Sequence, residues 1–175
     1  ERAIGRLEVA PEHQHERFGR KVAVVGQSRG GALARLLAVR RPELVSGIIT
    51  LGSPLTDQMA VHPFVRGPVF GLGLLGSLGV PGLFSRRCLN GECCGQARED
   101  AAAPFPDGVG FVSVFSRSDG IVDWRSCLDP AAEQVEVGAS HIGMSAHAET
   151  YRVIGRSLHA FGTARSVRRP LRRAA

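Results

Sequence analysis

A tight glycine-rich turn between an expected strand and an expected helix limits the possible folds of this chain more than any other feature. The strand is the apolar, valine-rich run at residues 21–26, which is typical of a parallel strand covered on both faces. The sequence GQSRGG follows at positions 26–31. Leucines then recur at the spacing of one helix face over residues 32–41, and Pro42 ends this helix.

A second buried strand at residues 45–51 completes a βαβ unit, whose crossover is expected to be right-handed. The other expected elements, in chain order, are a surface helix at 3–18 that is interrupted or irregular around Pro11, strands at 109–115 and 135–137, and a final helix at 146–161. This alternation predicts an α/β fold, with a mostly parallel sheet and helices on both of its faces.

Residues 55–108 lack such alternation. They are rich in Gly and Pro and contain an apolar run at 69–80, which is shorter than the ~20 residues that a membrane-spanning helix needs. Long irregular stretches inside a compact domain are usually functional, so a lid or cap is expected here. The predicted organisation is a core formed by 1–54 and 109–163, an inserted lid or cap at 55–108, and a disordered basic tail at 164–175.

The formal net charge of +6 is concentrated in that tail, which carries five arginines and no acid. The rest of the chain is therefore near neutral, and no nucleic-acid partner is expected. Contact of the tail with anionic lipid or nucleic acid is the less favoured alternative, because solvated charged termini are common. The first residues are polar and form no signal peptide, which favours the cytoplasm over secretion.

Three of the four cysteines, Cys88, Cys93 and Cys94, lie in one short segment, and the fourth is Cys127. Their spacing argues against a zinc site, because adjacent cysteines rarely ligate one tetrahedral ion and no Cys-x-x-Cys pair is present. Buried or idle thiols are the favoured interpretation. A disulfide from Cys88 to Cys93 or Cys94 is the alternative for an exported protein.

Ser28 is the predicted nucleophile. The glycines that flank it lie between a strand and a helix, as in a nucleophile elbow, where a strained turn lifts the serine hydroxyl above the carboxyl edge of the sheet. The backbone N–H of Arg29 and the positive end of the following helix can stabilise an oxyanion at the same place. A phosphate-binding turn is disfavoured, because neither the P-loop pattern nor GxGxxG occurs at this turn.

An activated serine needs a base, and the base needs an orienting acid. Asp119 follows the expected strand at 109–115, at a turn made by Gly120, and is preferred over Asp123 and Asp57. His141 lies on a loop of small residues before the last helix and is the predicted base. Four other histidines fit less well, since His147 and His159 lie at or near the last helix and His13 and His15 precede the serine.

Four segments, GQSRGG at 26–31, LGSPL at 51–55, SRSDG at 116–120 and SHIGM at 140–144, together resemble the α/β-hydrolase superfamily. The chain looks most like bacterial lipase- and esterase-type members, over about residues 21–161. The resemblance implies a triad of Ser28, His141 and Asp119 that acts through an acyl-enzyme. It also implies a lid that shapes an acyl-chain pocket, and a small-molecule ester or acyl substrate, lipids included.

The expected function is therefore hydrolysis of carboxylic esters without a metal or organic cofactor. An acyltransferase that uses the same acyl-enzyme is one alternative, and a non-catalytic binding domain of the same fold is another. Members of the superfamily usually place several strands before the elbow strand, and a loop after one of them supplies a second oxyanion donor. Only about twenty residues precede position 22, with no convincing strand. We therefore expect a fragment of a longer protein, poorly active alone and prone to aggregate at an exposed strand edge.

Overall fold

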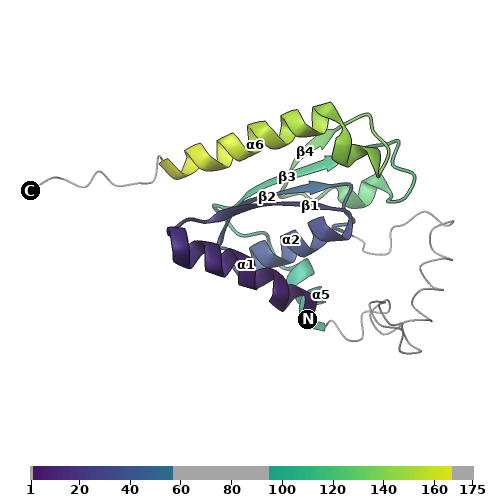
Figure 1. Cartoon of the computed structure of the whole chain (residues 1–175). Helices are drawn as coiled ribbons and strands as arrows, with labels where there is room; N and C mark the ends of the chain where they lie inside the picture. Colours follow the sequence, from purple (N-terminus) through teal and green to yellow (C-terminus); the bar gives the residue numbers. More distant parts are fainter. Residues whose placement is uncertain (1, 57–94, 167–175) are drawn as a thin grey trace, which may run out of the picture.

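A parallel four-stranded sheet organises the computed structural model, which describes residues 2–56 and 95–166 (Figure 1). The strands lie side by side in chain order: β1 (Val22–Gln27), β2 (Val45–Leu51), β3 (Gly110–Phe115) and β4 (Glu133–Glu136). Each neighbouring pair is parallel, with Val25 opposite Ile49 and Ile49 opposite Val112. The carboxyl ends of all four strands therefore meet at one edge of the sheet.

Helices cover both faces of this sheet (Figure 1). The helices α1 (Arg2–Phe18), α2 (Arg29–Arg40) and α5 (Gly95–Ala102) lie on one side, and α6 (Ala148–Ser166) lies on the other. Because successive side chains of a strand point to opposite faces, Ile48 packs in the core beneath α2, whereas Ile49 packs beneath α6. The expected α/β architecture is thus confirmed, with α2 and the β2, β3, β4 and α6 segments within a few residues of their predicted positions.

Close packing of α6 depends on two strand glycines that face each other. Gly47 of β2 is paired with Gly110 of β3. A methyl group placed on Gly47 would lie 2.5 Å from the ring of Phe161, and one on Gly110 would meet the same ring. The last aromatic residue of the predicted helix face therefore lies directly on the sheet backbone, where larger residues would push α6 away.

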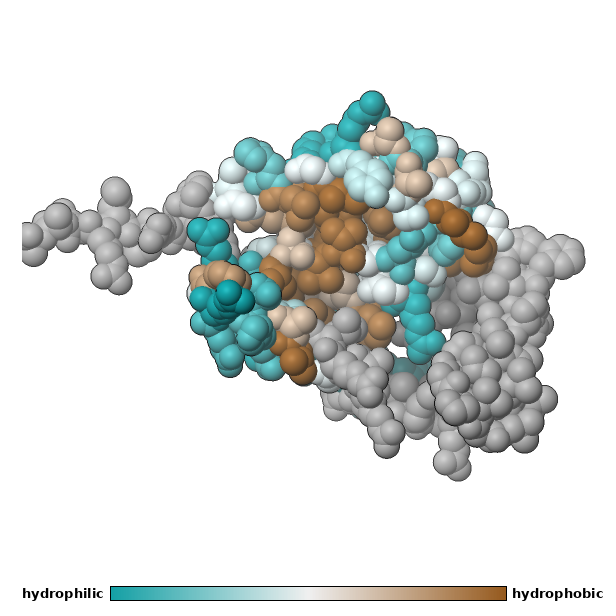
Figure 2. All heavy atoms as spheres, in the orientation of Figure 1, coloured by the Kyte–Doolittle hydropathy of each residue, from teal (hydrophilic) through white to brown (hydrophobic). Residues whose placement is uncertain are grey.

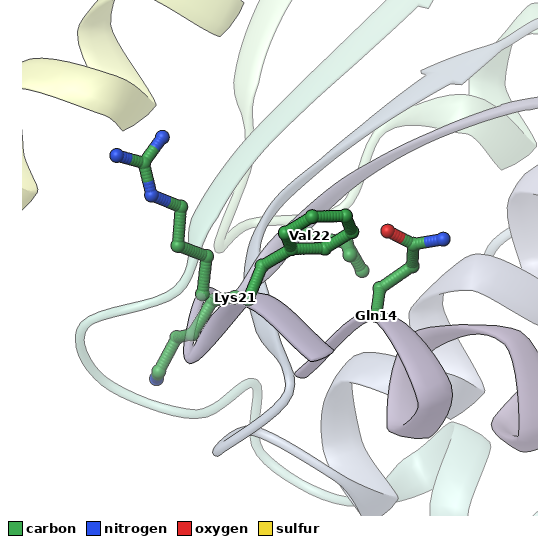
Figure 3. Close-up of a pocket in the computed structure, with 5 residues that line it drawn as sticks. Gln14, Lys21 and Val22 are labelled. Carbon is green, nitrogen blue, oxygen red and sulfur yellow. The ribbon is translucent and has the colours of Figure 1, made fainter. Parts of the chain in front are cut away.

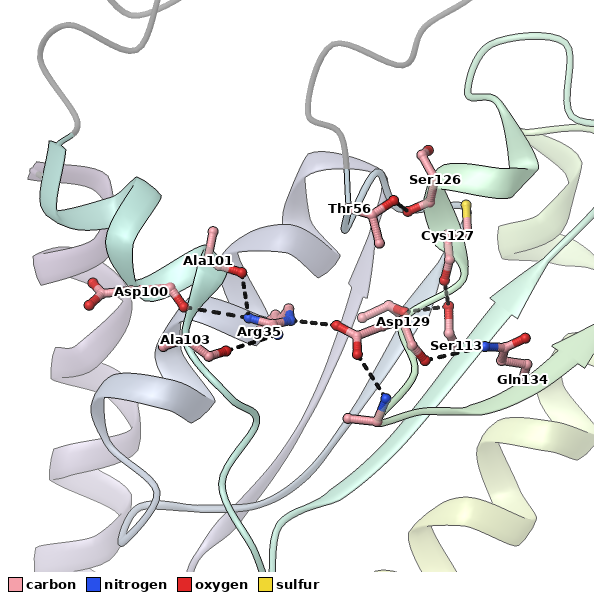
Figure 4. A network of polar contacts seen from close by, with 12 residues as sticks. Arg35, Thr56, Asp100, Ala101, Ala103, Ser113, Ser126, Cys127, Asp129 and Gln134 are labelled. Atoms are coloured by element: carbon pink, nitrogen blue, oxygen red, sulfur yellow. Dashed lines mark hydrogen bonds and ion pairs between the residues drawn. The ribbon is translucent and has the colours of Figure 1, made fainter.

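A buried ion pair joins α2 to the loop before β4, and the same arginine bonds to the end of α5 (Figure 4). Arg35, which is 8% exposed, donates from Nε to Oδ2 of Asp129 at 2.7 Å. Its other guanidinium nitrogens donate to the carbonyls of Ala101 at 3.0 Å and Ala103 at 3.3 Å, at and just after the carboxyl end of α5. The charge is thus matched by a carboxylate, and the orphan carbonyls of the short helix gain donors.

Three local predictions were wrong. The first helix was expected to be interrupted or irregular around Pro11, but α1 continues through this residue. It does so although a proline removes one hydrogen bond of the helix. Residues 95–102, predicted to be irregular, form α5 and pack against α2. Finally, the described residues cover only one face of β1.

The uncovered face of β1 carries Ala23 and Val25, and Val25 is 43% exposed. The reason is that α6 packs on β2 and β3, while α2 packs on the opposite face of β1 and β2. Figure 2 shows the resulting apolar area in the middle of the view, between α6 and α1.

Several predicted features lie outside the described residues, so the structure does not test them. They are the apolar run at 69–80 and most of the expected lid, the segment with Cys88, Cys93 and Cys94, the rival acid Asp57, and the tail from 167 onward. Within the described part of the chain, no helix is long and apolar enough to cross a membrane.

Candidate active site

Asp119 and His141 form a direct pair at the carboxyl edge of the sheet. Asp119 lies in the turn after β3, and its side chain is 1% exposed. Its Oδ2 lies 2.7 Å from Nδ1 of His141. Its Oδ1 accepts backbone hydrogen bonds from Ile121 at 2.8 Å and Val122 at 2.9 Å. Two backbone amides and the imidazole therefore hold this buried carboxylate in one orientation.

His141 lies on a loop between β4 and the short 3₁₀ helix η2 (Gly143–Ala146). The loop is closed by its own hydrogen bonds, because the hydroxyl of Ser140 accepts from the amide of Gly143 and the carbonyl of Ser140 accepts from Met144. The side-chain amide of Gln27 donates to the carbonyl of His141 at 2.6 Å. The imidazole is 10% exposed, so one edge of the ring remains accessible.

Ser28 lies in a strained turn between β1 and α2. Its φ of 53° and ψ of −126° make it the one non-glycine residue with positive φ in the described part of the chain. Such a conformation costs of order 1–3 kcal/mol and persists only where the surrounding structure enforces it. Here a methyl group on Gly26 would lie 2.5 Å from the carbonyl of Gly30, and one on Gly31 would clash with Ser53. The turn therefore requires glycine on both sides of the serine.

The end of β2 links this turn to the Asp119–His141 pair. The amide of Ser28 donates to the carbonyl of Leu51 at 2.8 Å. The next residue, Gly52, has a φ of 51°, and a methyl group on it would lie 2.9 Å from Oδ2 of Asp119 and 3.2 Å from Nδ1 of His141. Ser28, Asp119 and His141 therefore all lie at the carboxyl edge of the sheet. Among the described residues, no hydrogen bond joins the hydroxyl of Ser28 to His141.

The alternatives to these residues lie elsewhere. Asp123 precedes the 3₁₀ helix η1 (Trp124–Cys127), accepts from the amide of Arg125 and is exposed. His159 is exposed on α6, and His147 precedes α6. His13 and His15 belong to α1, on the helical layer beside α2. Among these candidates, Asp119 and His141 are the acid and the histidine whose side chains are in contact, and their catalytic roles stay a prediction.

Arg29, the predicted oxyanion donor, is the first residue of α2 and directly follows Ser28. The amides of a first helical turn point out of the helix at its positive end, where a developing negative charge is stabilised. Gln27 and Gly52 were not singled out from the sequence. The glutamine side chain gives no pattern that distinguishes it, because its contact spans 114 residues of chain.

A buried thiol lies behind the pair. Cys127 is 1% exposed and is a free cysteine. Burial, with a smaller contribution from the negative charge of Asp119, raises the pKa of Cys127 to about 12. The thiol is therefore neutral at physiological pH.

A pocket of about 530 Å³ lies near the start of β1, away from Ser28, and Figure 3 shows the residues that line it. It is lined by residues of α1 and of the approach to β1, namely Gln14, Phe18, Arg20, Lys21 and Val22. Val22 is the first residue of β1, whereas Ser28 follows the last, so this pocket is separate from the candidate site. In the described ranges, no cluster of three or more His, Cys, Asp or Glu residues is suited to hold a metal ion.

No family model matches the sequence, and no curated protein matches it at a significant level. Several solved structures are similar to this chain. The lipase BlEst2 of Bacillus licheniformis in its mature form is similar with a TM-score of 0.53 and 17% identity, over 75% of this chain and 62% of that protein. A thermophilic esterase is similar with a TM-score of 0.52 and 20% identity, over 91% of this chain and 73% of that protein.

The third similar structure is the mouse alpha/beta hydrolase domain-containing protein 10, with a TM-score of 0.55 and 16% identity, over 91% of this chain and 70% of that protein. This chain therefore spans between 62% and 73% of these three proteins. The parallel sheet, the order of helices and strands along the chain, and the similarity to these structures all indicate the same fold. The chain has the α/β-hydrolase fold.

Proposed function

We propose that this chain is a serine-dependent hydrolase of carboxylic esters. The observation that carries the proposal is the 2.7 Å contact between Nδ1 of His141 and Oδ2 of Asp119, at the same sheet edge as the strained turn of Ser28. A buried carboxylate on one imidazole nitrogen leaves the other nitrogen to act as a base toward a nearby hydroxyl. The lipase and esterase names of two similar structures support this reaction class.

In the proposed reaction, the hydroxyl oxygen of Ser28 attacks the ester carbonyl while Nε2 of His141 takes the hydroxyl proton. Asp119 keeps the proton of Nδ1 in place and stabilises the imidazolium. The carbonyl oxygen becomes an oxyanion that the backbone N–H of Arg29 stabilises. The imidazolium then protonates the leaving alcohol, and the acyl group remains on Ser28.

Water completes the cycle by the same route. His141 takes a proton from water, the hydroxide adds to the acyl-enzyme, and collapse of the second tetrahedral intermediate returns the proton to Ser28 and releases the carboxylic acid. Proton transfer, orientation and charge stabilisation are supplied by side chains and backbone, so the cycle uses no metal or organic cofactor. The substrate that we propose is a small ester with an acyl chain of some length, lipids included.

A fluorophosphonate probe tests this proposal directly, because it modifies only an activated serine. The 175-residue chain, which we expect to be poorly active alone, is expected to be labelled slowly on the peptide that contains Ser28, and Ser28→Ala is expected to abolish labelling. Ser118→Ala is the matched control, since Ser118 is an exposed serine in the turn before Asp119. Absence of labelling in the unaltered chain, or equal labelling of Ser28→Ala, would contradict the proposal.

A further inference from the structure

Gln27 connects the strand that precedes the proposed nucleophile to the loop that carries the proposed base. It is the last residue of β1 and stands directly before Ser28. Its side-chain amide donates to the backbone carbonyl of His141 at 2.6 Å, across 114 residues of sequence. A short hydrogen bond of this kind fixes the distance between two backbone segments that no strand pairing brings together, because β1 and β4 are at opposite edges of the described sheet.

The His141 loop is anchored at its start, where the amide of Val137 donates to the carbonyl of Phe115 at 2.9 Å, and Ala139 packs in the core with Met144 and Val153. Within the described residues, two hydrogen bonds tie residues 138–142 to other parts of the fold, one from Gln27 and one to Asp119. The remaining bonds of the loop, such as those of Ser140 to Gly143 and Met144, are local and do not set its position. Asp119 fixes the tilt of the imidazole, whereas Gln27 fixes the backbone from which the ring projects.

Ser28 is held by the same short stretch of chain. Its amide is bonded to Leu51 at 2.8 Å, and Gln27 is paired with Leu51 in the β1–β2 register. The backbone of Ser28 is therefore connected to the backbone of His141 through one residue, Gln27, and the hydrogen bond of its side chain. Reacting groups must be held within roughly 0.5 Å of their productive geometry, and a 1 Å error can cost about 100-fold in rate.

We infer that Gln27 is a positioning residue that sets the distance between the hydroxyl of Ser28 and the imidazole of His141. The inference rests on the proposed function, since it concerns the same nucleophile and base. Gln27 contacts neither the substrate nor the reacting atoms through this bond. It acts through the backbone of His141, as a neutral donor that adds no charge beside the imidazole.

Two variants remove the donor in different ways. Gln27→Leu is of similar size and cannot donate, and Gln27→Glu keeps the shape but presents oxygens that repel the carbonyl of His141. The matched control is Gln134→Leu in β4, because Gln134 also donates its side-chain amide to a backbone carbonyl, that of Asp129 at 3.2 Å. This control removes a bond of the same type outside the candidate site.

The experiment measures the kinetics of fluorophosphonate inactivation of the full 175-residue chain at the pH plateau of each variant. Both Gln27 variants are expected to lower the maximal inactivation rate about 10- to 100-fold, with the probe's half-saturation concentration changed less than about twofold. The final labelled fraction and the midpoint of thermal unfolding are expected to match the unaltered chain. A purely structural role would instead reduce the labelled fraction and leave the rate of the labelled molecules unchanged.

The outcomes separate the inference from the proposed function. If the unaltered chain is labelled at Ser28 and both Gln27 variants keep its inactivation rate, the positioning role is wrong while the proposed function stands. A rate loss in Gln134→Leu equal to that in Gln27→Leu also overturns the positioning role. If the unaltered chain is not labelled at Ser28, both ideas fail together.

Discussion

Asp119 offers its two carboxylate oxygens to different partners: Oδ2 lies 2.7 Å from Nδ1 of His141, and Oδ1 accepts the amides of Ile121 and Val122. The backbone bonds hold the carboxylate in one orientation, and the carboxylate in turn selects the imidazole tautomer with its proton on Nδ1. In that tautomer Nε2 carries a lone pair and can accept the proton of a hydroxyl. Both backbone donors to Oδ1 belong to the turn after β3 in which Asp119 itself lies.

Asp119→Asn is expected to lower the rate of Ser28 labelling by about 10³- to 10⁴-fold. The asparagine keeps the shape and can still accept the two backbone bonds, but its amide group can donate to Nδ1 and favour the wrong tautomer. Labelling kinetics with a fluorophosphonate measure the effect. Thermal unfolding checks that the variant is folded.

Asp123→Asn is the matched control for this variant. Asp123 is four residues away, and its exposed carboxylate accepts from the backbone amide of Arg125 rather than from a histidine. The labelling rate of Asp123→Asn is expected to stay within about twofold of the unaltered chain. A loss in Asp123→Asn as large as that in Asp119→Asn would mean that Asp119 is not the orienting acid.

Gly52→Ala is expected to disrupt the same pair from the other side. The new methyl group would lie 2.9 Å from Oδ2 of Asp119 and 3.2 Å from Nδ1 of His141, and the φ of 51° adds backbone strain. The labelling rate should fall at least about tenfold, because a displacement of about 1 Å is enough for such a loss. Gly138→Ala is the control, since a methyl group on Gly138 meets nothing within 4 Å. Full activity in Gly52→Ala would show that the pair can relax around the methyl group.

Periodicity in the sequence predicted the fold wherever a segment is buried by its neighbours. The strand at 45–51 was placed correctly to the residue, because all but one of its residues are buried and the GSP turn at 52–54 marks its end. The same pattern in β1 was misleading, because an apolar run does not report that Ala23 and Val25 face an uncovered area. The short helix α5 was missed because its hydrogen-bonded partner, Arg35, is 60 or more residues away in sequence.

The residues of the candidate site were predictable from local chemistry, because each follows a strand and therefore lies at the carboxyl edge. The glycines around Ser28 and the acid after β3 have recognisable neighbours in the chain. Gln27 and Gly52 contribute through contacts across the sheet edge instead. Those contacts depend on the register between strands, which the sequence pattern alone does not determine.

Cys127 is expected to resist thiol reagents in the folded protein. Because its pKa is raised to about 12, only about one thiol in ten thousand is ionised at pH 8, and the sulfur is 1% exposed. Alkylation with iodoacetamide followed by peptide mapping should leave the Cys127 peptide unmodified in buffer and modify it fully in denaturant. Modification of the native Cys127 peptide at the rate of the denatured chain would show that the thiol is accessible.

Val25→Lys is expected to reduce self-association. In the described sheet β1 pairs with β2 on one side only, and Val25 is 43% exposed on an apolar face. Charged residues on an edge strand oppose pairing with another chain. Val9→Lys is the matched control, because Val9 is 60% exposed but lies on a helix. Light scattering across a concentration series should show a smaller mean mass for Val25→Lys than for Val9→Lys, and equal masses would exclude association through β1.

Asp129→Asn is expected to lower the free energy of unfolding by about 3–5 kcal/mol, because it leaves the buried guanidinium of Arg35 without a counter-charge. The native pair is 2.7 Å long, and its two side chains are 9% and 7% exposed. Glu136→Gln makes the same chemical change in a surface pair, where Arg117 and Glu136 are 65% and 48% exposed, and should change the free energy within the error of the measurement. Urea unfolding followed by circular dichroism measures both variants. Equal free energies for the two variants would mean that water or a shifted side chain screens the charge of Arg35 once Asp129 is neutral.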